Sequence, residues 1–429
     1  MINKRVIVIG AGAGGMMAAG QAASCGAEVL LLEKMEQPGK KILISGKSRC
    51  NLTNTKELEE FIQAYGINGR FLYPAFKRFF RDDLIDFLKK LGVLTKAERG
   101  GRVFPESDDA HDVVSAFRRY LNENRVKLQT GVNVKAIAIS GGRVTAVKTD
   151  QAEYPCDAVI LATGGSSWPA TGSTGDGYKI ASALGHTIIK LRPALVPLIV
   201  EEIDLVKSMQ GVSLKNIRLT AYQGESESIG QPRSTKTIID SQMGEMMITH
   251  FGLGGPLTLL MSLDIVDALE KGPVSVAIDL KPGLSIKQLQ IRLQRDFDSY
   301  NKKSFQNILK ELLPLKMIDS IVRLSGIDPN KQGNQINAKE RDSLITLLKS
   351  LRFNIKGPLP LGSAMVTAGG VSLKEIDPRT MASRIIKGLY FCGEVMDINA
   401  DTGGYNLQAA FSTGYLAGES ATAYIKNPE

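Results

Sequence analysis

The sequence predicts an α/β protein whose first domain is interrupted by an insertion, and three observations lead to this prediction. Residues 5–33 read as a buried strand, a glycine-rich turn, a helix and a second strand. The same strand–turn–helix pattern returns at residues 388–408. Between these segments the composition changes at Arg192, where a stretch that alternates like small antiparallel sheets begins, and residues 283–351 are helical in pattern. We therefore expect both ends of the chain to share one strand-and-helix domain.

The opening strand holds four consecutive β-branched residues and runs into Gly10-x-Gly12-x-x-Gly15. In this context Gly10 permits a tight turn, Gly12 lets the backbone approach a pyrophosphate, and Gly15 lets helix and strand pack closely. The phosphates would lie at the helix N-terminus, where free N–H groups favour an anion. Glu33, 18 residues after Gly15, is placed to accept a hydrogen bond from a ribose 2′-OH. This Rossmann-type pattern disfavours NADP and leaves FAD and NAD; a purely structural glycine turn is the alternative.

The loop after the second strand, residues 34–54, is rich in glycine and in small polar or basic groups. Glycines there can bring backbone near a ligand, basic side chains can neutralise phosphate, and small polar side chains can satisfy the polar edge of a ring. The residues in these three roles are Gly39 and Gly46; Lys40, Lys41 and Arg49; and Ser45, Asn51 and Thr53. A surface loop with a helix cap at Ser45 or Thr53 is the alternative.

Residues 57–125 read as mainly helical, with a break at residues 100–105. Strands follow from residue 126, with a hairpin turn at Gly141 and Gly142. A further buried strand ends in Ala162-Thr163-Gly164, which would pass its backbone close to a nucleotide or form an ordinary strand end. The loop at 166–178 is either ligand-facing or a helix-capping loop. In the inserted segment, His250 is a possible proton donor or a packing histidine.

Near the end of the chain, a strand runs into Gly393-Glu394, with Asp397 in the following loop. Gly403 and Gly404 then start a helix rich in Ala and Gly. Such a helix N-terminus would stabilise negative charge on the N1–C2=O edge of a reduced flavin, and Asp397 could bind a hydroxyl of the ribityl chain. An NAD enzyme does not need this second strand and helix, so the pattern favours FAD.

Composition excludes several classes of protein. The chain has 429 residues, of which 43% are hydrophobic and 23% charged, as in soluble proteins of two or three domains. No apolar run is long enough for a membrane span, and we expect no signal peptide. Four scattered cysteines indicate a reducing compartment, the cytoplasm, and neither they nor three scattered histidines form a metal site. The net charge of +9 is spread among acids, so we expect no nucleic-acid partner.

Four motifs, at residues 46–54, 171–177, 249–256 and 393–406, together resemble the HI0933-like (BaiN/YhiN-type) NAD(P)/FAD-dependent oxidoreductases over essentially the whole chain. The resemblance implies a Rossmann-type FAD domain of the glutathione-reductase or fumarate-reductase kind, split by a β-rich domain and a helical subdomain. We expect the FAD domain at residues 1–190 and 361–429, the β-rich domain at 191–282 and 352–360, and the helical subdomain at 283–351. The chain departs from the family pattern at Ser48 and Ala400, where that pattern has glycine, which puts the fine position of the flavin in doubt.

Fingerprint and resemblance together define the expected site. The expected FAD contacts are Gly10, Gly12, Ala13, Gly14, Gly15, Glu33, Lys34, Gly39, Lys40, Lys41, Ser45, Gly46, Arg49, Cys50, Asn51, Val134, Ala162, Thr163, Gly164, Gly393, Glu394, Asp397, Gly404, Tyr405, Asn406 and Leu407. His250, Tyr405 and Arg49 are the candidates for facing a substrate, and the sequence assigns no catalytic triad.

The expected activity is hydride transfer between a small organic substrate and flavin N5, with NAD(P)H as reductant. No second glycine fingerprint follows a strand, so NAD(P)H would dock transiently in the substrate cleft. Two alternatives stay open: an oxidase of small amines that uses O₂, and a flavoprotein that binds a protein or RNA partner without turnover.

Overall fold

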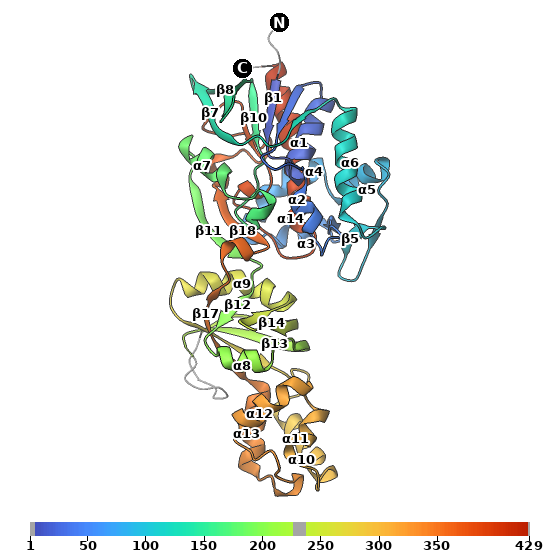
Figure 1. Cartoon of the computed structure of the whole chain (residues 1–429), viewed down its shortest axis with the longest axis vertical. Coiled ribbons are helices and arrows are strands. Elements are labelled where there is room, and N and C mark those ends of the chain that lie inside the picture. Colours follow the sequence, from blue (N-terminus) through green and yellow to red (C-terminus); the bar gives the residue numbers. More distant parts are fainter. Residues whose placement is uncertain (1–4, 226–236, 428–429) are drawn as a thin grey trace. The chain divides into compact units, whose positions relative to one another are not determined.

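The computed structural model describes residues 5–225 and 237–427, and the chain divides into two compact units. The first unit joins residues 1–192 to residues 361–429, and the second is the continuous segment 193–360 (Figure 1). Each unit has its own hydrophobic core.

A five-stranded parallel sheet forms the centre of the first unit. Its strand order is β19 (Leu389–Phe391), β10 (Ala158–Leu161), β1 (Arg5–Ile9), β2 (Glu28–Leu32) and β6 (Lys127–Gln129). β1 lies in the middle, and its four β-branched residues, all buried, suit a strand that is covered on both faces. The carboxyl ends of β1, β2, β10 and β19 therefore meet at one edge of the sheet.

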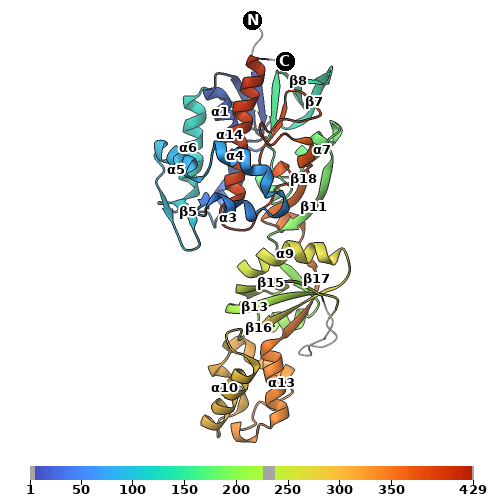
Figure 2. The same cartoon turned by 180° about the vertical axis from the view of Figure 1, so that it is seen from behind.

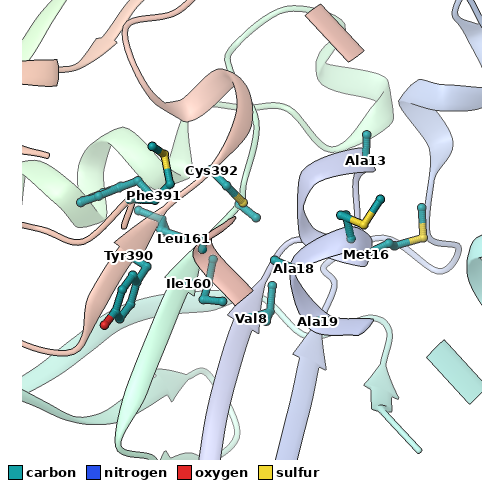
Figure 3. Packing of buried hydrophobic residues seen from close by; sticks show 14 of the residues in the cluster. Val8, Ala13, Met16, Ala18, Ala19, Ile160, Leu161, Tyr390, Phe391 and Cys392 are labelled. Carbon is teal, nitrogen blue, oxygen red and sulfur yellow. The ribbon is translucent and has the colours of Figure 1, made fainter. Parts of the chain in front are cut away.

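Two long helices from opposite ends of the chain pack against each other on this sheet. α1 (Ala13–Ser24) and α14 (Tyr405–Lys426) lie side by side in both views (Figure 1 and Figure 2). Their approach needs small residues, because a Cβ at Gly414 would collide with the carbonyl oxygen of Gly14, and one at Gly418 with that of Ala18. Figure 3 shows the core where α1 meets the sheet strands.

The other elements of the first unit surround this centre. The helices are α2 (Lys40–Ile44), α3 (Leu58–Gln63), α4 (Tyr73–Arg78), α5 (Arg81–Lys90), α6 (Ala110–Glu123) and α7 (Asp176–Ala183). Small sheets are formed by β3 (Thr53–Asn54), β5 (Arg102–Pro105) and β4 (Thr95–Ala97); by β7 (Val134–Ser140), β8 (Arg143–Thr149) and β9 (Glu153–Pro155); and by β11 (Ile188–Ala194) and β18 (Val366–Val371). The predicted hairpin turn at Gly141 and Gly142 joins β7 and β8 and is confirmed.

The break predicted at residues 100–105 is wrong in part. Gly100 and Gly101 do form a turn, but residues 102–105 are the strand β5, paired with β4 and β3. Val103 and Phe104 are buried there. Burial of these two apolar side chains stabilises the strand, although glycine and proline flank it in the sequence. The burial depends on tertiary packing, which a local sequence pattern does not show.

The second unit is a closed antiparallel barrel with helices. Its strand order is β12 (Leu198–Val200), β15 (Gly252–Gly254), β14 (Ile238–Ile248), β13 (Ser213–Gln223), β16 (Val274–Asp279) and β17 (Leu351–Pro358). The helices are α8 (Ile203–Ser208), α9 (Pro256–Leu269), α10 (Ile286–Ser299), α11 (Phe305–Ile308), α12 (Ile318–Ser325) and α13 (Ala338–Lys349). α10–α13 lie in the segment predicted to be helical, and their buried residues join the barrel's core.

Within residues 5–225 and 237–427, no helix combines the length and the apolar character that crossing a membrane requires.

Candidate functional site

The glycine turn between β1 and α1 distinguishes glycines that the fold needs from one that it does not. Gly10 has φ +100°, and a Cβ there would lie 2.6 Å from the carbonyl oxygen of Ala162. A Cβ at Gly15 would collide with the carbonyl oxygen of Gly10. At Gly12, however, a Cβ would meet nothing within 4 Å. Gly12 therefore borders open space at the end of β1, a cradle that a side chain would fill and a phosphate group would fit.

The N-terminus of α1 points into this region without a cap. Gly12 is the N-cap residue, no side chain bonds the first turn, and that turn holds no acidic residue. The first N–H groups of a helix have no partner inside the helix, and the helix dipole adds partial positive charge. An anionic ligand is the partner that fits this end.

Glu33 lies at the end of β2 beside the same turn. Its buried carboxylate accepts hydrogen bonds from the backbone N–H of Ala11 at 2.6 Å and of Met35 at 2.9 Å. Each carboxylate oxygen can accept a second bond, so the residue can hold the turn and still receive a ribose hydroxyl.

The N-terminus of α14 is a second uncapped helix end in the first unit. Gly404 is its N-cap residue, with φ +98°, and the first turn has neither a side-chain cap nor an acidic residue. Asn51 accepts a hydrogen bond from the Gly404 N–H at 3.0 Å in the amide orientation that satisfies its partners. Asn54, which is 1% exposed, donates to the carbonyl oxygens of Gly403 at 3.0 Å and Gly100 at 3.1 Å. The two asparagines therefore clamp the turn that starts α14.

A buried polar atom lies beside this clamp. Thr53 is fully buried, and its Oγ1 has no hydrogen-bond partner among the described residues. A Cβ on Gly404 would collide with the Thr53 backbone, so the two residues are in direct contact. An uncapped helix end beside an unsatisfied hydroxyl fits the polar edge of a ring such as the flavin.

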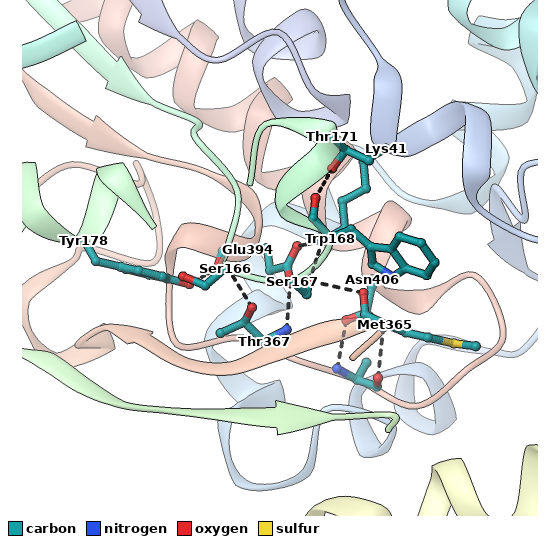
Figure 4. A network of polar contacts seen from close by, with 11 residues as sticks. Lys41, Ser166, Ser167, Trp168, Thr171, Tyr178, Met365, Thr367, Glu394 and Asn406 are labelled. Carbon is teal, nitrogen blue, oxygen red and sulfur yellow. Dashed lines mark hydrogen bonds and ion pairs between the residues drawn. The ribbon is translucent and has the colours of Figure 1, made fainter. Parts of the chain in front are cut away.

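A polar network connects the ends of β2, β10 and β19 (Figure 4). The Glu394 carboxylate accepts from Lys41 Nζ at 2.6 Å, from Ser167 Oγ at 3.1 Å and from the Thr367 N–H at 2.8 Å. Lys41 also donates to Ser167 at 2.7 Å. Of the predicted contacts, Lys41 and Glu394 thus bind each other, and Ser167 and Thr367 join them.

The three residues predicted to face a substrate lie in different settings. Arg49 pairs with Glu98 at 2.8 Å and Asp108 at 3.1 Å, and its guanidinium lies 4.0 Å from the centroid of the Phe104 ring. Tyr405 is buried, its ring centroid lies 4.6 Å from that of Phe61, and burial raises the pKa of its hydroxyl.

His250 is exposed in the turn between β14 and β15 of the second unit, so it does not share a unit with the other two.

Two further predicted contacts organise loops. Asp397 receives Asn68 Nδ2 on its carboxylate at 3.2 Å and on its carbonyl oxygen at 2.8 Å, and burial raises the pKa of this carboxyl. Asn406 bonds both the N–H and the carbonyl oxygen of Ala400 at 2.9 Å.

The remaining predicted contacts lie around the same sheet edge or in its supports. They are Ala13 and Gly14 in the first turn of α1; Lys34, paired with Asp176; Gly39, Lys40, Ser45 and Gly46 on α2 and its flanks; Cys50, whose pKa burial raises to about 12; Val134 at the start of β7; Ala162, Thr163 and Gly164 after β10; Gly393; and Leu407 in α14. Thr163 Oγ1 lies beside Gly177 of α7, where a Cβ on that glycine would collide with it, and so it packs against α7 instead of facing the cradle.

Four residues at the site were missed: Asn54, Asn68, Ser167 and Thr367. Two of them carry a local signal, since Asn54 ends the motif at 46–54 and Ser167 lies in the loop at 166–178.

Comparisons with known proteins agree with this fold. The family model described as HI0933-like protein Rossmann domain matches residues 4–420. The 3-dehydro-bile acid delta(4,6)-reductase of Clostridium scindens is 34% identical over 420 residues, covering 97% of this chain and 98% of that protein. The ribosomal RNA dihydrouridine synthase of Escherichia coli is 30% identical, with the same coverage.

Two solved structures share the fold. A 3-ketosteroid delta1-dehydrogenase from Sterolibacterium denitrificans has a TM-score of 0.53 at 14% identity and covers 98% of this chain and 100% of its own. A flavocytochrome c3 fumarate reductase has a TM-score of 0.52 at 17% identity, with 98% and 78% covered. The predicted fold class, a Rossmann-type domain of the fumarate-reductase kind with inserted β-rich and helical parts, is confirmed.

Proposed function

Because the chain belongs to the HI0933-like family of flavoproteins, we propose that it is an FAD-dependent reductase of a carbon–carbon double bond conjugated to a carbonyl group. The observation that carries this proposal is the pair of uncapped helix ends, one beside the open cradle at Gly12 and the other beside the unsatisfied hydroxyl of Thr53. A dinucleotide with a polar-edged ring matches both ends at once.

The names of the two relatives narrow the reaction. A delta(4,6)-reductase of a 3-dehydro bile acid saturates double bonds conjugated to the ring carbonyl, and a dihydrouridine synthase saturates the C5=C6 bond conjugated to the uracil C4 carbonyl. Reduction of a double bond conjugated to a carbonyl in this way adds a hydride to the carbon remote from the carbonyl and a proton to the neighbouring carbon. The shared chemistry, rather than either substrate, is what we transfer to this chain.

Each part of the site has a role in this proposal. Gly12 and the α1 N-terminus hold the pyrophosphate, and Glu33 receives the adenosine ribose. Asn51 and Asn54 hold the turn before α14, so that its N–H groups can bind the N1–C2=O edge of the ring. When bound, FAD supplies the hydride chemistry at N5, while the protein supplies binding, orientation and electrostatics.

The reductant and the inserted domains complete the proposal. NAD(P)H is the reductant, docking transiently beside the flavin because the chain has one glycine fingerprint. The β-rich domain of residues 191–282 and 352–360 binds the substrate, and residues 283–351 form its helical subdomain.

Anaerobic reduction tests the reductase. The purified yellow protein is mixed with NADH or NADPH, and the visible absorbance of oxidised flavin is followed. We expect bleaching that an added cyclic enone reverses. A flavin that neither nucleotide bleaches would contradict the reductase, and peroxide formation with small amines would support the oxidase instead.

Uridine in RNA is a second candidate substrate. The E. coli relative, a ribosomal RNA dihydrouridine synthase, favours it. Incubating the reduced protein with an unmodified ribosomal RNA transcript should yield nucleosides heavier by two hydrogen atoms. Filter binding at two salt concentrations measures RNA binding separately from turnover, since binding through phosphate contacts weakens steeply with salt.

A further inference from the structure

Trp168 is the single tryptophan of the chain, and its setting is unusual. It has φ 55°, in the left-handed region that a bulky side chain rarely adopts, and it is 43% exposed. Its indole N–H has no hydrogen-bond partner among the described residues. Neither burial nor hydrogen bonding of the side chain accounts for an aromatic residue in this conformation.

The fold holds Trp168 in this conformation from both sides. Its N–H donates to the Gly362 carbonyl oxygen at 3.2 Å, and its own carbonyl oxygen accepts from the N–H of Thr171 at 2.9 Å and its hydroxyl at 2.8 Å. The preceding residue, Ser167, is fully buried and bonded to Lys41 and Glu394. Strained residues that the surroundings over-determine in this way occur at ligand-binding sites.

The position of Trp168 is that of a ligand-binding residue. It lies in the loop after β10, at the sheet edge formed by the carboxyl ends of the parallel strands, where open α/β sheets bind ligands. Figure 4 shows the side chains of Trp168 and Met365 extending to the same side of the polar network. Met365 is 46% exposed. The indole and the thioether are thus two partly exposed apolar groups on one side of the network in this view.

Lys41 is the cationic member of this network. Its side chain is 27% exposed, and its ammonium, which has three N–H donors, donates to Glu394 and Ser167. One N–H therefore remains for a ligand oxygen. An aromatic face beside a cationic donor matches a flat ring that carries a carbonyl group.

We propose that Trp168 is a binding residue on which a planar, unsaturated ring bearing a carbonyl group stacks, with the carbonyl oxygen directed to Lys41. This rests on the proposed function, in which such a ring is either the enone substrate or the nicotinamide of NAD(P)H. Both rings share this chemistry, and the experiment distinguishes them.

Binding titrations of the FAD-loaded protein test the proposal. The probes are NADP⁺ and NAD⁺ in one arm and a cyclic enone steroid in the other, with oxidised flavin so that no turnover occurs. Because Trp168 is the only tryptophan, its emission reports on this loop alone. A flavin difference spectrum measures the same affinity in variants that lack tryptophan.

We expect a bound ring to change the Trp168 emission. Trp168→Leu should bind the stacked probe about 5- to 150-fold more weakly, while Trp168→Phe stays within about threefold of wild type. Trp168→Gly relieves the backbone conformation, so it should unfold at a higher temperature yet bind as weakly as Trp168→Leu. Leu94→Ala, which shortens an apolar residue that is 53% exposed and immediately precedes β4, is the matched control and should change nothing.

The arms have distinct outcomes. A loss confined to the nicotinamide arm identifies the reductant as the stacked ring, and a loss confined to the enone arm identifies the substrate. Unchanged affinity for both probes in Trp168→Leu overturns the inference. FAD content and bleaching by NAD(P)H are measured on the same variants, so failure of the proposed function shows separately, as wild-type protein that holds no FAD or does not bleach.

Discussion

Substituting alanine at Gly12 and at Gly15 separates cofactor binding from packing within one turn. Gly12 has φ −79° and ψ −168°, which any residue adopts, and its Cβ would meet nothing within 4 Å. Gly15 differs, because a Cβ would collide with the carbonyl oxygen of Gly10 and lie 3.2 Å from the Ala162 Cβ. The two variants add the same methyl group three residues apart.

The expected magnitudes differ in kind. Gly12→Ala should leave the apoprotein unchanged or more stable by about 0.4–1 kcal/mol, since alanine narrows the unfolded ensemble. Its methyl group keeps phosphate oxygens from the backbone, and losing two charged hydrogen bonds at about 1.5–3 kcal/mol each weakens FAD binding roughly 10²- to 10⁴-fold. Gly15→Ala should destabilise the apoprotein by about 1–3 kcal/mol through overpacking.

Urea unfolding of the apoproteins and FAD titration by fluorescence quenching measure both quantities. Gly12→Ala binding FAD within about threefold of wild type would refute the assignment of the cradle to the pyrophosphate. Equal destabilisation by the two variants would refute the claim that Gly12 has no packing role.

Three further predictions follow from the polar contacts. In Asn54→Asp the side chain cannot donate a hydrogen bond to the Gly403 carbonyl oxygen, so the turn before α14 should loosen and the midpoint potential of bound FAD should fall. The potential is measured by equilibration with a redox dye. An unchanged potential would contradict the role of Asn54 in holding this turn. Lys41→Met and Glu394→Gln should each lower the free energy of unfolding, and a double-mutant cycle should give an interaction energy of about 1–3 kcal/mol between the two residues. If the two losses of stability simply add, the ion pair contributes no interaction energy and the prediction is wrong. Burial lowers the pKa of His186 below its ordinary 6.5, despite the neighbouring acid, so on acidification the unfolded chain binds a proton before the folded protein does. The free energy of unfolding should therefore fall as pH drops below about 6.5. Urea unfolding at about pH 5.5 and about pH 7.5 should show a smaller change for His186→Gln than for wild type, and an equal change in both proteins would contradict the explanation.

The local part of this fold was predictable from sequence because its signals are local. The strand, glycine turn, helix and second strand of residues 5–33 carry their burial and their turn in adjacent residues. Gly10 and Gly15 have the structural roles that the fingerprint predicts. The hairpin at Gly141 and Gly142 and the helical character of 283–351 follow from periodicity in the same way.

The partners of side chains were not predictable, because they are set by tertiary structure. Lys41 and Glu394 are 353 positions apart, so the sequence predicts a ligand contact for each of them and gives no sign that they pair with each other. Arg49 is likewise neutralised by Glu98, in the turn between β4 and β5, and by Asp108, in the loop that follows β5. Closure of the second unit into a six-stranded barrel also depends on pairings, such as β12 with β17, that no local pattern contains.

The pairing of α1 with α14 bears on how the protein is made. The inner strands β1, β2 and β10 emerge early from the ribosome, but the edge strand β19 and the covering helix α14 emerge after residue 388. The second unit is continuous from 193 to 360 and can fold while that end is still being synthesised. During this interval the small-residue face of α1 lacks the helix that covers it, so we expect the nascent first unit to expose apolar surface until α14 has been synthesised.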